Sequence, residues 1–442
     1  KDDFAGTLID GEHILHNKQG EFINLYAAFD IYYIKKESVR EKMFVSLDEE
    51  DIKTNQRLHL LINLINELKV KSSDDKIPMI FDYKRFFMSG EETNIFDACK
   101  RILDKEKDGL IDYNTDGLIF TPAEFGVGGN AKNQSSDLKK ITWDYSFKWK
   151  PPEYNTIDFL VITKKDSNNS EEIGNVFQKG EDLSDSGSGI SQYKTLELHV
   201  GFDTRKHGYI NPCADVIQDN LPKISDIDDY NSYKPMKFYP TEPYDDKAHL
   251  CKMFLTNDDI GNKIMLTKEG EVFEDEMIVE FAYDTNEEDP LLRWKPLRVR
   301  YDKTAEFKAG ERNFGNAYHV ANNNWKTIHN PITDHMISTG NDIPEEEQDD
   351  DVYYNRVTKS RLTESLRAFH NLVVKKQLIT AVSNRGDSLI DFAVGKGGDF
   401  PKWIASKLGF IFGIDISNDN IENKLDGACA RYFNYRKQYK IM

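Results

Sequence analysis

Apolar and polar positions follow two different periods along the chain. In residues 51–70 apolar positions recur every three to four residues, which predicts a helix with one apolar face. These positions are Leu58, Leu61, Ile62, Ile65 and Leu68. Runs rich in β-branched and aromatic residues at 21–34, 116–122 and 145–162 predict strands. The first part of the chain is therefore expected to combine sheet with a packed helix.

The middle of the chain is expected to be mostly strand. Residues 164–189 are polar and rich in glycine and serine, so they predict a surface loop, and a strand resumes at 193–202. Between residues 233 and 333 several short apolar runs predict a small barrel or sandwich. These runs are 249–255, 262–267, 275–284 and 292–302.

An acidic stretch at 337–355 precedes the C-terminal part. It has seven carboxylates and no lysine or arginine, which is typical of a self-repelling linker. A helix with an apolar face is predicted at 361–379, and a strand, a glycine turn, a helix and a strand follow at 389–417. A domain of this type needs more strands, so we expect the sequence to stop inside it.

Composition narrows the class of protein. The 442 residues are 39% hydrophobic, which suits several packed domains, and no apolar run reaches the ~20 residues of a membrane span. The net charge of −18 argues against a general nucleic-acid coat but leaves room for a basic cleft. Four scattered cysteines indicate neither a zinc site nor a disulfide framework, and a reducing compartment fits best.

The glycine turn contains a candidate cofactor site. Gly395, Gly397 and Gly398 allow close approach of a ligand, yet they match neither a Walker A loop nor the dinucleotide fingerprint. Asp415 ends the strand after the turn, where an acid roughly 20 residues beyond the first strand can bind both ribose hydroxyls. Ribose binding without a pyrophosphate cradle indicates S-adenosylmethionine. The alternative is an ordinary strand–turn–helix with glycine for packing.

Two C-terminal motifs resemble mRNA cap guanine-N7 methyltransferases. The run Asp391 to Asp399 resembles their first motif, and the helix before it resembles their Arg-x-Phe-Asn-Asn-x-x-Lys segment. Asn371 and Lys375 are four apart rather than three, which implies one inserted residue. The resemblance implies that Asn371 lines the cap and cofactor pocket. The implied S-adenosylmethionine contacts are Lys375, Asp391, Gly395, Gly397 and Asp415.

Charged pairs near strands mark a second candidate site upstream. Glu12 and Asp116 each lie beside a glycine at a strand, and two carboxylates could hold a divalent metal or ribose hydroxyls. Lys148 and Lys150 are two apart in a predicted strand, so both ammonium groups would face one side and attract a phosphate. Each motif alone is weak, because Lys-x-Lys is usually surface charge and Asp-Gly is usually a turn.

In chain order these motifs resemble the series of the covalent nucleotidyltransferases, which include DNA ligases, RNA ligases and mRNA guanylyltransferases. The series covers residues 7–303, and Asp116 replaces the commoner glutamate. Its members here are Asp10-Gly11-Glu12, Phe29-Asp30, Asp116-Gly117-Leu118-Ile119-Phe120, Lys148-Trp149-Lys150 and Arg300-Tyr301-Asp302-Lys303.

The resemblance implies that GMP passes from GTP to the 5′-diphosphate end of RNA through a lysyl-GMP intermediate. Lys148 and Lys150 would stabilise the α-phosphate, while Glu12 and Asp116 would hold Mg²⁺ or Mn²⁺. Phe29 would stack on guanine. The groups expected to close onto the β- and γ-phosphates from an OB-fold lid are Arg300, Asp302 and Lys303.

The family carries its nucleophilic lysine in a K-x-D-G motif before D-G-E, so we expect that lysine to lie upstream of Lys1. The K-x-D-G at Lys424 to Gly427 follows every other motif, and we interpret it as a chance match.

The combination resembles the large-subunit mRNA-capping enzymes of cytoplasmic large DNA viruses, such as poxviruses, African swine fever virus and giant viruses. The stretch from Trp294 to Thr333 supports this resemblance, because ligases do not share it. A multidomain α+β and α/β protein is therefore expected. Its implied parts are a covalent-nucleotidyltransferase fold at 1–232, an OB-fold lid at 233–335, an acidic linker at 336–357 and the start of a Rossmann-like methyltransferase at 358–442.

The resemblance also implies substrates, partners and a location. GTP and the 5′ end of mRNA would be substrates, and a small stimulatory methyltransferase subunit and the viral RNA polymerase are candidate partners. No membrane association is expected, and the implied location is the host cytoplasm or the virion. Two alternatives stay open: an ATP- or NAD-dependent nucleic-acid ligase, and a non-catalytic scaffold that binds capped RNA or a polymerase.

Overall fold

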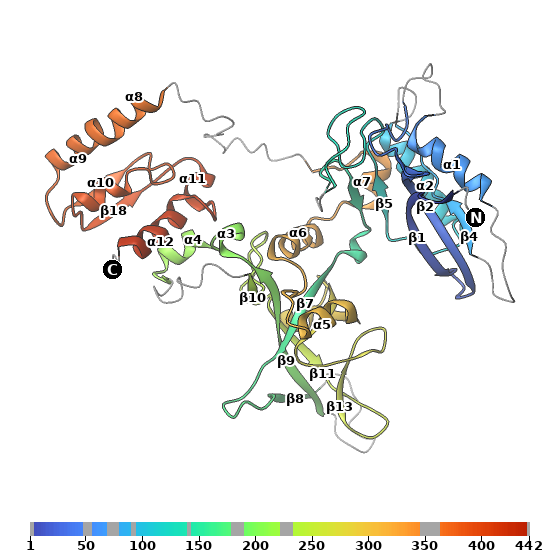
Figure 1. The fold of residues 1–442 in the computed structure, drawn as a ribbon. Helices are drawn as coiled ribbons and strands as arrows, with labels where there is room; N and C mark the ends of the chain where they lie inside the picture. The colour runs from blue at the N-terminus through green and yellow to red at the C-terminus, as the bar shows by residue number, and fades with distance from the viewer. Residues whose placement is uncertain are drawn as a thin grey trace. The chain divides into compact units, whose positions relative to one another are not determined.

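The computed structural model describes residues 4–46, 55–68, 79–89, 94–138, 143–177, 190–221, 233–344 and 363–439. The chain forms two compact units, and Figure 1 shows the elements of both. The first unit is residues 1–155 with 331–344, and the second is residues 156–330 with 345–442. Within the described ranges, no helix is both long enough and apolar enough to cross a membrane.

The first unit contains a four-stranded sheet in which β2 pairs with all three other strands. β1 and β3 run antiparallel to β2, and β4 runs parallel to it. The strands are β1 (Leu8–His16), β2 (Phe22–Ile34), β3 (Glu37–Ser38) and β4 (Ile80–Tyr83). Helix α1 (Arg57–Glu67) packs Leu61, Leu64 and Ile65 against this sheet, which confirms the helix predicted from the apolar period.

A second, smaller core lies in the same unit. It joins Cys99 and Leu103 to Leu118 and Trp149, and the Trp149 indole donates a hydrogen bond to the Ile332 carbonyl at 2.8 Å. Its elements are α2 (Ile95–Lys107), β5 (Leu118–Phe120), β6 (Phe147–Trp149), η2 (Pro152–Tyr154) and α7 (Asp334–Thr339).

The expected acidic linker is partly helical. Thr333 caps α7 by accepting a hydrogen bond from the backbone N–H of Met336, so residues 334–339 are helix rather than linker. The seven-carboxylate stretch falls mostly on 345–355, which lies outside the described residues.

The second unit is built on a seven-stranded sheet. The strand order is β10-β9-β7-β15-β16, and β8 and β11 pair with the other half of the long strand β9. A separate sheet has the order β12-β13-β14. The strands are β7 (Thr156–Thr163), β8 (Ile173–Phe177), β9 (Ile190–Phe202), β10 (Lys234–Lys237), β11 (Leu250–Phe254), β12 (Thr256–Asn257), β13 (Lys263–Leu266), β14 (Val272–Phe273), β15 (Met277–Tyr283) and β16 (Trp294–Val299).

An aromatic core holds this sheet to its helices. Phe159, Phe281, Trp294 and Trp325 are at most 2% exposed, and their rings meet at centroid distances between 4.9 and 6.4 Å. The helices and turns before residue 345 in this unit are α3 (Thr204–His207), α4 (Pro212–Ile217), η4 (Pro290–Leu292), α5 (Tyr301–Lys308) and α6 (Tyr318–His329).

Three features of this unit differ from the sequence prediction. The loop predicted at 164–189 contains strand β8, which pairs antiparallel with the first half of β9. Residues 1–232, the range expected for the nucleotidyltransferase fold, span both units. The reason is that β7 pairs with β9 and with β15, which places β7 and β9 in the second unit. The described strands make no closed barrel, since the sheet path ends at β10 and β16.

The C-terminal part, residues 363–439, carries a strand–turn–helix–strand unit. β17 and β18 are parallel neighbours with Asp391 opposite Gly413, and α10 crosses between them. The helix before β17 is continuous but changes type, with a π-helical turn at its centre. The elements are α8 (Glu364–Phe369), the π-helix η6 (His370–Lys375), α9 (Lys376–Val382), β17 (Ser388–Asp391), α10 (Phe400–Ala405), β18 (Phe410–Gly413), α11 (Asn418–Glu422) and α12 (Ala428–Tyr439).

Candidate nucleotide and cofactor sites

A cleft of about 800 Å³ in the first unit brings together three of the predicted site residues. Glu12 from β1, Phe29 from β2 and Asp116 at the start of β5 all line it. Glu12 lies opposite Ala27 in the β1–β2 register, two positions before Phe29 on the neighbouring strand. Residues 104 positions apart in the chain therefore converge on one cavity of the size that ligand pockets usually have.

The Lys-x-Lys pair lies at the end of β6, with Lys148 on the strand and Lys150 directly after it, and it reaches the cleft through Asp116. Trp149 is buried, so Lys148 and Lys150 point to the opposite, exposed side of the strand, as the alternation of a strand requires. The Lys150 amine lies 2.9 Å from an Asp116 carboxylate oxygen. Burial would raise the pKa of Asp116, but the hydrogen bond and charge of Lys150 and the charge of Lys148 outweigh it and lower that pKa.

Gly117 explains why an Asp-Gly pair stands here. Its φ is +134°, and a Cβ atom would lie 1.9 Å from the carbonyl oxygen of Trp149. Only glycine therefore allows β5 to approach β6 so closely that Asp116 and Lys150 meet.

Lys84 also lines the cleft and was missed by the sequence analysis. Its amine lies 2.5 Å from a Glu12 carboxylate oxygen and 5.7 Å from the centroid of the Phe29 ring. Its backbone N–H donates to the Ala28 carbonyl and extends the pairing of β4 with β2. The signal was the apolar run before Lys84, which places this lysine at a strand end.

The glycine turn is organised by Asp415. One carboxylate oxygen of Asp415 accepts from the Gly395 N–H at 2.7 Å, and the other accepts from Ser417 N–H and the Asn420 amide, both at 3.0 Å. Burial would raise the pKa of Asp415, but these hydrogen bonds lower it. Asp391 accepts a hydrogen bond from the Ala393 N–H at 3.0 Å. Because β17 and β18 are parallel neighbours, both predicted acids lie at the carboxyl ends of adjacent strands.

Two glycines of the turn adopt left-handed backbone. Gly395 has φ +53° and Gly397 has φ +69°, and a Cβ atom at Gly397 would lie 2.1 Å from the Phe400 ring. Lys375 at the end of the π-helix reaches the turn, where its amine lies 3.1 Å from Asp399. Asn371, on the same π-helix, is half-buried and four positions before Lys375.

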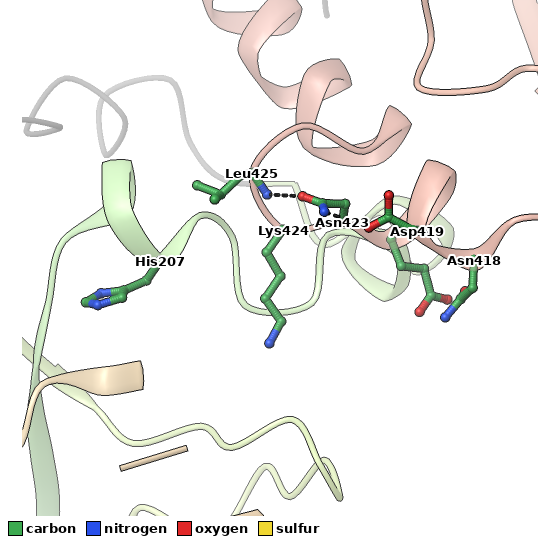
Figure 2. A pocket seen from close by; sticks show the side chains of 7 residues that line it. His207, Asn418, Asp419, Asn423, Lys424 and Leu425 are labelled. Atoms are coloured by element: carbon green, nitrogen blue, oxygen red, sulfur yellow. Dashed lines mark hydrogen bonds between the residues drawn. The ribbon is translucent and has the colours of Figure 1, made fainter. Parts of the chain in front are cut away.

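The K-x-D-G sequence at Lys424 to Gly427 lies in the second unit. Lys424 donates from its amine to the Thr241 hydroxyl at 2.7 Å, and Asp426 pairs with Lys396 at 2.8 Å. Figure 2 shows Lys424 beside His207 and the residues of α11 around a pocket of about 430 Å³. Glu12 and Asp116 belong to the other unit.

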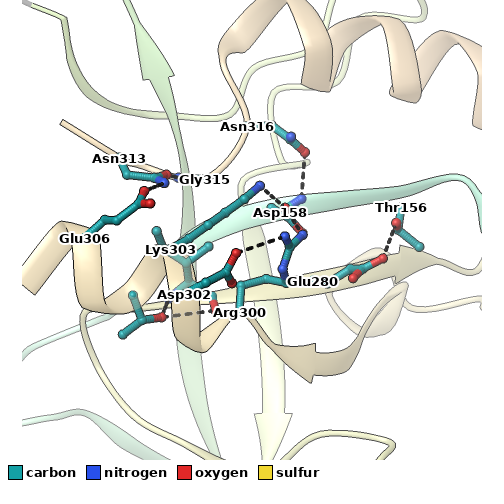
Figure 3. A network of polar contacts seen from close by, with 12 residues as sticks. Thr156, Asp158, Glu280, Arg300, Asp302, Lys303, Glu306, Asn313, Gly315 and Asn316 are labelled. Atoms are coloured by element: carbon teal, nitrogen blue, oxygen red, sulfur yellow. Dashed lines mark hydrogen bonds and ion pairs between the residues drawn. The ribbon is translucent and has the colours of Figure 1, made fainter. Parts of the chain in front are cut away.

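Arg300, Asp302 and Lys303 lie at the junction of β16 and α5, around one buried carboxylate (Figure 3). Asp158 on β7 is 5% exposed, and its Oδ2 atom lies 2.6 Å from Arg300 and 2.5 Å from Lys303. Asp302 is exposed and lies 3.5 Å from Arg300. Asp158 was missed, although a single acid inside an apolar strand indicates a buried ion partner.

No cluster of three or more histidine, cysteine, aspartate or glutamate side chains placed to hold a metal occurs among the described residues. Glu12 and Asp116 supply two carboxylates to the cleft. Each is ion-paired with a lysine, Glu12 with Lys84 and Asp116 with Lys150, so a metal held here would replace these lysines as partner. Mg²⁺ usually takes one or two carboxylates and completes its shell with phosphates and water, so such an ion would arrive with a nucleotide.

No family model matches the chain, but curated proteins do. The probable mRNA-capping enzyme of Acanthamoeba polyphaga mimivirus is 29% identical over 345 residues, which are 74% of this chain and 26% of that protein. The mRNA-capping enzyme of Danio rerio is 26% identical over 167 residues, or 36% of this chain and 23% of that protein.

Shorter similarities concern methyltransferases. The mRNA cap guanine-N(7) methyltransferase 1 of Arabidopsis thaliana is 35% identical over 78 residues, which cover 16% of this chain and 21% of that protein. The chain thus spans about a quarter of the length of the curated relatives it matches.

Proposed function

We propose that this chain belongs to an mRNA-capping enzyme with two activities. The first transfers GMP from GTP to 5′-diphosphate RNA through a lysyl-GMP intermediate, and the second methylates N7 of the cap guanine from S-adenosylmethionine. Similarity to capping enzymes and to cap guanine-N7 methyltransferases supports both activities. The viral large-subunit type, the OB-fold lid and the Rossmann-like start of the methyltransferase are finer parts of the same proposal.

The observation that carries the first activity is the shared cleft. Glu12, Phe29 and Asp116 line one cavity, and Lys150 is ion-paired to Asp116 at its edge. An aromatic ring for the base, carboxylates for hydroxyls or a metal, and cations for phosphate are the groups that a nucleoside triphosphate needs. The Lys84 amine, which lies 5.7 Å from the centroid of the same ring and is paired with Glu12, belongs to this site.

The chemistry proposed for the cleft is nucleophilic substitution at phosphorus. A neutral lysine amine forms a bond to the α-phosphorus of GTP, and the bond to the pyrophosphate oxygen breaks. A terminal oxygen of diphosphate RNA then displaces the lysine and receives GMP. Lys148 and Lys150 stabilise the charge on the α-phosphate oxygens in both steps. A divalent ion at Glu12 and Asp116 would neutralise phosphate charge when bound.

Arg300 and Lys303 are proposed to bind the β- and γ-phosphates. Both cations are held on Oδ2 of the buried Asp158 carboxylate, an anionic oxygen of the kind that a phosphate also offers to arginine and lysine. Asp302 lies beside Arg300 and orients its guanidinium. Phosphate binding must therefore exchange one anionic partner for another.

The second activity rests on the glycine turn. We propose that Asp391, Gly395, Gly397 and Asp415 bind S-adenosylmethionine. The two glycines have a positive φ and let a ligand approach the backbone closely, and three hydrogen bonds hold the Asp415 carboxylate in place. Exposed apolar side chains flank the acids, with Phe392 76% and Ile416 97% exposed. Lys375 and Asn371 would complete the cofactor and cap pocket from the π-helix.

The 5′ end of mRNA is the proposed macromolecular substrate. The proposed location is the host cytoplasm or the virion, and a small stimulatory subunit and the viral RNA polymerase remain proposed partners. These assignments rest on the resemblance to viral capping enzymes.

Nucleotide labelling of the complete polypeptide tests the proposal. Incubation with α-labelled GTP or ATP and a divalent ion is expected to give a covalent, GTP-dependent protein adduct that pyrophosphate removes. An adduct with ATP alone would support a nucleic-acid ligase. Absence of any adduct, together with no methylation of preformed caps, would support a non-catalytic scaffold.

A further inference from the structure

Residues 204–217 and Thr241 contact the C-terminal part of the chain over several kinds of interaction. Lys424 follows Thr241 by 183 positions, and β11–β16, α5, α6 and the acidic stretch lie between them in sequence. Figure 2 shows their meeting point, where His207 lies across a pocket from Asn423, Lys424 and Leu425.

The backbone contact is specific for glycine. The Tyr209 N–H donates to the Lys424 carbonyl at 2.9 Å. Gly208 has φ +69°, and a Cβ atom there would lie 2.2 Å from the same carbonyl oxygen. A side chain at Gly208 would therefore push the two segments apart, because the obstacle is backbone rather than a mobile side chain.

Side chains reinforce the backbone contact. The Tyr209 ring meets Phe433, which is 1% exposed, edge to face at 4.9 Å, and its hydroxyl donates to Asn434 at 2.9 Å. Lys424 reaches back to Thr241 at 2.7 Å. Burial lowers the pKa of Lys424, as expected for an amine enclosed by this contact.

Two thiols lie at the same contact. Cys213 is on α4 and Cys429 on α12, two helices that pack together, and the two thiols are close enough to influence each other's pKa. Burial is the main cause that raises the pKa of both thiols, that of Cys429 to about 12. These cysteines are 216 positions apart in the chain, so their proximity reports directly on the contact between the two segments.

We propose that residues 204–217 with Thr241 form an intramolecular docking surface for the glycine-turn unit, so that the body carrying Arg300 and Lys303 and the proposed methyl-transfer unit move together. Five contacts of different kinds join them, so the acidic stretch is not their only connection. The functional meaning rests on the proposed function, because movement of the phosphate-binding body would then also move the S-adenosylmethionine site.

Gly208→Ala tests the docking surface, with Gly270→Ala as its matched control. Gly270 lies in the turn between β13 and β14, has φ +81° and has no heavy atom within 4 Å of the position that a Cβ atom would take. Both substitutions place alanine at a positive φ. Gly208 differs from Gly270 in two ways: its ψ of −150° is a conformation that glycine alone adopts readily, and its Cβ atom would collide with Lys424. Gly270→Ala therefore controls for alanine at a positive φ elsewhere in the second unit.

The measured quantity is the fraction of full-length chain that carries a Cys213–Cys429 disulfide at equilibrium with reduced and oxidised glutathione. This fraction gives the effective concentration of one thiol at the other. Oxidised glutathione accepts two electrons as one S–S bond forms between the cysteines and two glutathione thiols are released. Peptide mass spectrometry quantifies the Cys213–Cys429 disulfide. We expect it in the wild type and in Gly270→Ala, and an effective concentration at least about tenfold lower in Gly208→Ala.

Two results would overturn the docking surface. Mixed disulfides with glutathione in place of the Cys213–Cys429 bond in the wild type would show that the segments do not meet. Equal effective concentrations in both glycine variants would show that Gly208 does not control the contact. The disulfide measurement needs no nucleotide and no methyl donor, so it tests the docking surface even if the proposed function is wrong.

A second arm examines the functional meaning in the complete polypeptide. Two substrates are compared: caps that the same polypeptide has just formed, and cap analogue added from outside. Relative to Gly270→Ala, Gly208→Ala is expected to methylate the newly formed caps more slowly and the added analogue at the same rate. Equal rates for both substrates in the two variants would refute the link between docking and function.

Discussion

Lys148, Trp149 and Lys150 alternate across β6, and this alternation decides what each side chain can do. Trp149 fills the small core with Leu118 and Leu103, which leaves both lysines on the exposed side. The sequence predicted that the lysines share one side, because the period of a strand is two. It could not predict that Lys150 meets Asp116, because that contact depends on the pairing of β5 with β6.

Gly117 makes that pairing measurable. Gly117→Ala forces a left-handed backbone on alanine and places Cβ against the Trp149 carbonyl, so we expect a loss of roughly 3 kcal/mol in the free energy of unfolding of the first unit. Urea denaturation followed by tryptophan fluorescence measures it. Gly20→Ala is the control, with φ +81° and open space around Cβ, and should lose only about 1 kcal/mol. Equal losses would contradict the close approach of β5 to β6.

At the scale of elements, the strand–turn–helix–strand at 389–417 was predicted from its sequence, and the structure confirms it as β17, α10 and β18. The π-helix was not predicted, but its signal was present. One extra residue in an α-helix widens a turn into a π-helix, and the four-residue spacing of Asn371 and Lys375 indicated one insertion. Strand β8 was missed because its polar and glycine-rich surroundings are typical of a loop.

Asp158 links β7 to α5, and its charge holds two cations. Asp158→Asn removes that charge and leaves Arg300 and Lys303 to repel each other, so we expect the second unit to lose about 2–3 kcal/mol of stability. Chemical denaturation measures the loss. Asp289→Asn, which removes a more exposed carboxylate paired with Lys252, should cost under about 1 kcal/mol. A smaller loss in Asp158→Asn than in Asp289→Asn would contradict this role.

Asp399 gives the C-terminal part an acid-sensitive contact. Burial would raise its pKa, but Lys402 and Lys375 outweigh burial and lower it in the folded chain. A lowered folded pKa means that the stabilisation is present above the unfolded pKa of about 3.9 and is lost as pH falls through the folded value. The protection factors of the α10 amides, which are exchange rates corrected for the intrinsic effect of pH, should therefore fall on acidification below about pH 4.

Asp399→Asn should show that α10 effect already at pH 7, with a cost of about 2 kcal/mol, because Lys402 is buried while Lys375 is partly exposed. Its α10 protection factors should then change less with pH than those of the wild type. Unchanged protection at pH 7 would contradict the assigned contact.

At the scale of the whole molecule, two sites with different chemistry lie in different compact units. The cleft of Glu12, Phe29 and Asp116 is in the first unit, and the glycine turn with Asp415 is in the second. The order of motifs predicted two functions, but residue order could not reveal that β7 pairs with both β9 and β15, so that a unit boundary falls at residue 155. That division depends on strand pairing between segments more than 100 residues apart.

The central claim is that nucleotide transfer and methyl transfer use separate sites, and paired assays of Lys150→Ala and Asp415→Ala in the complete polypeptide test it most directly. Lys150→Ala should lose at least about a hundredfold in GMP-adduct formation, because a cation at the α-phosphate is gone, yet methylate preformed caps normally. Asp415→Ala should form the adduct normally and fail to methylate. Lys164→Ala, which removes a lysine from another exposed ion pair, should change neither activity. Loss of both activities together in either folded variant would contradict the account.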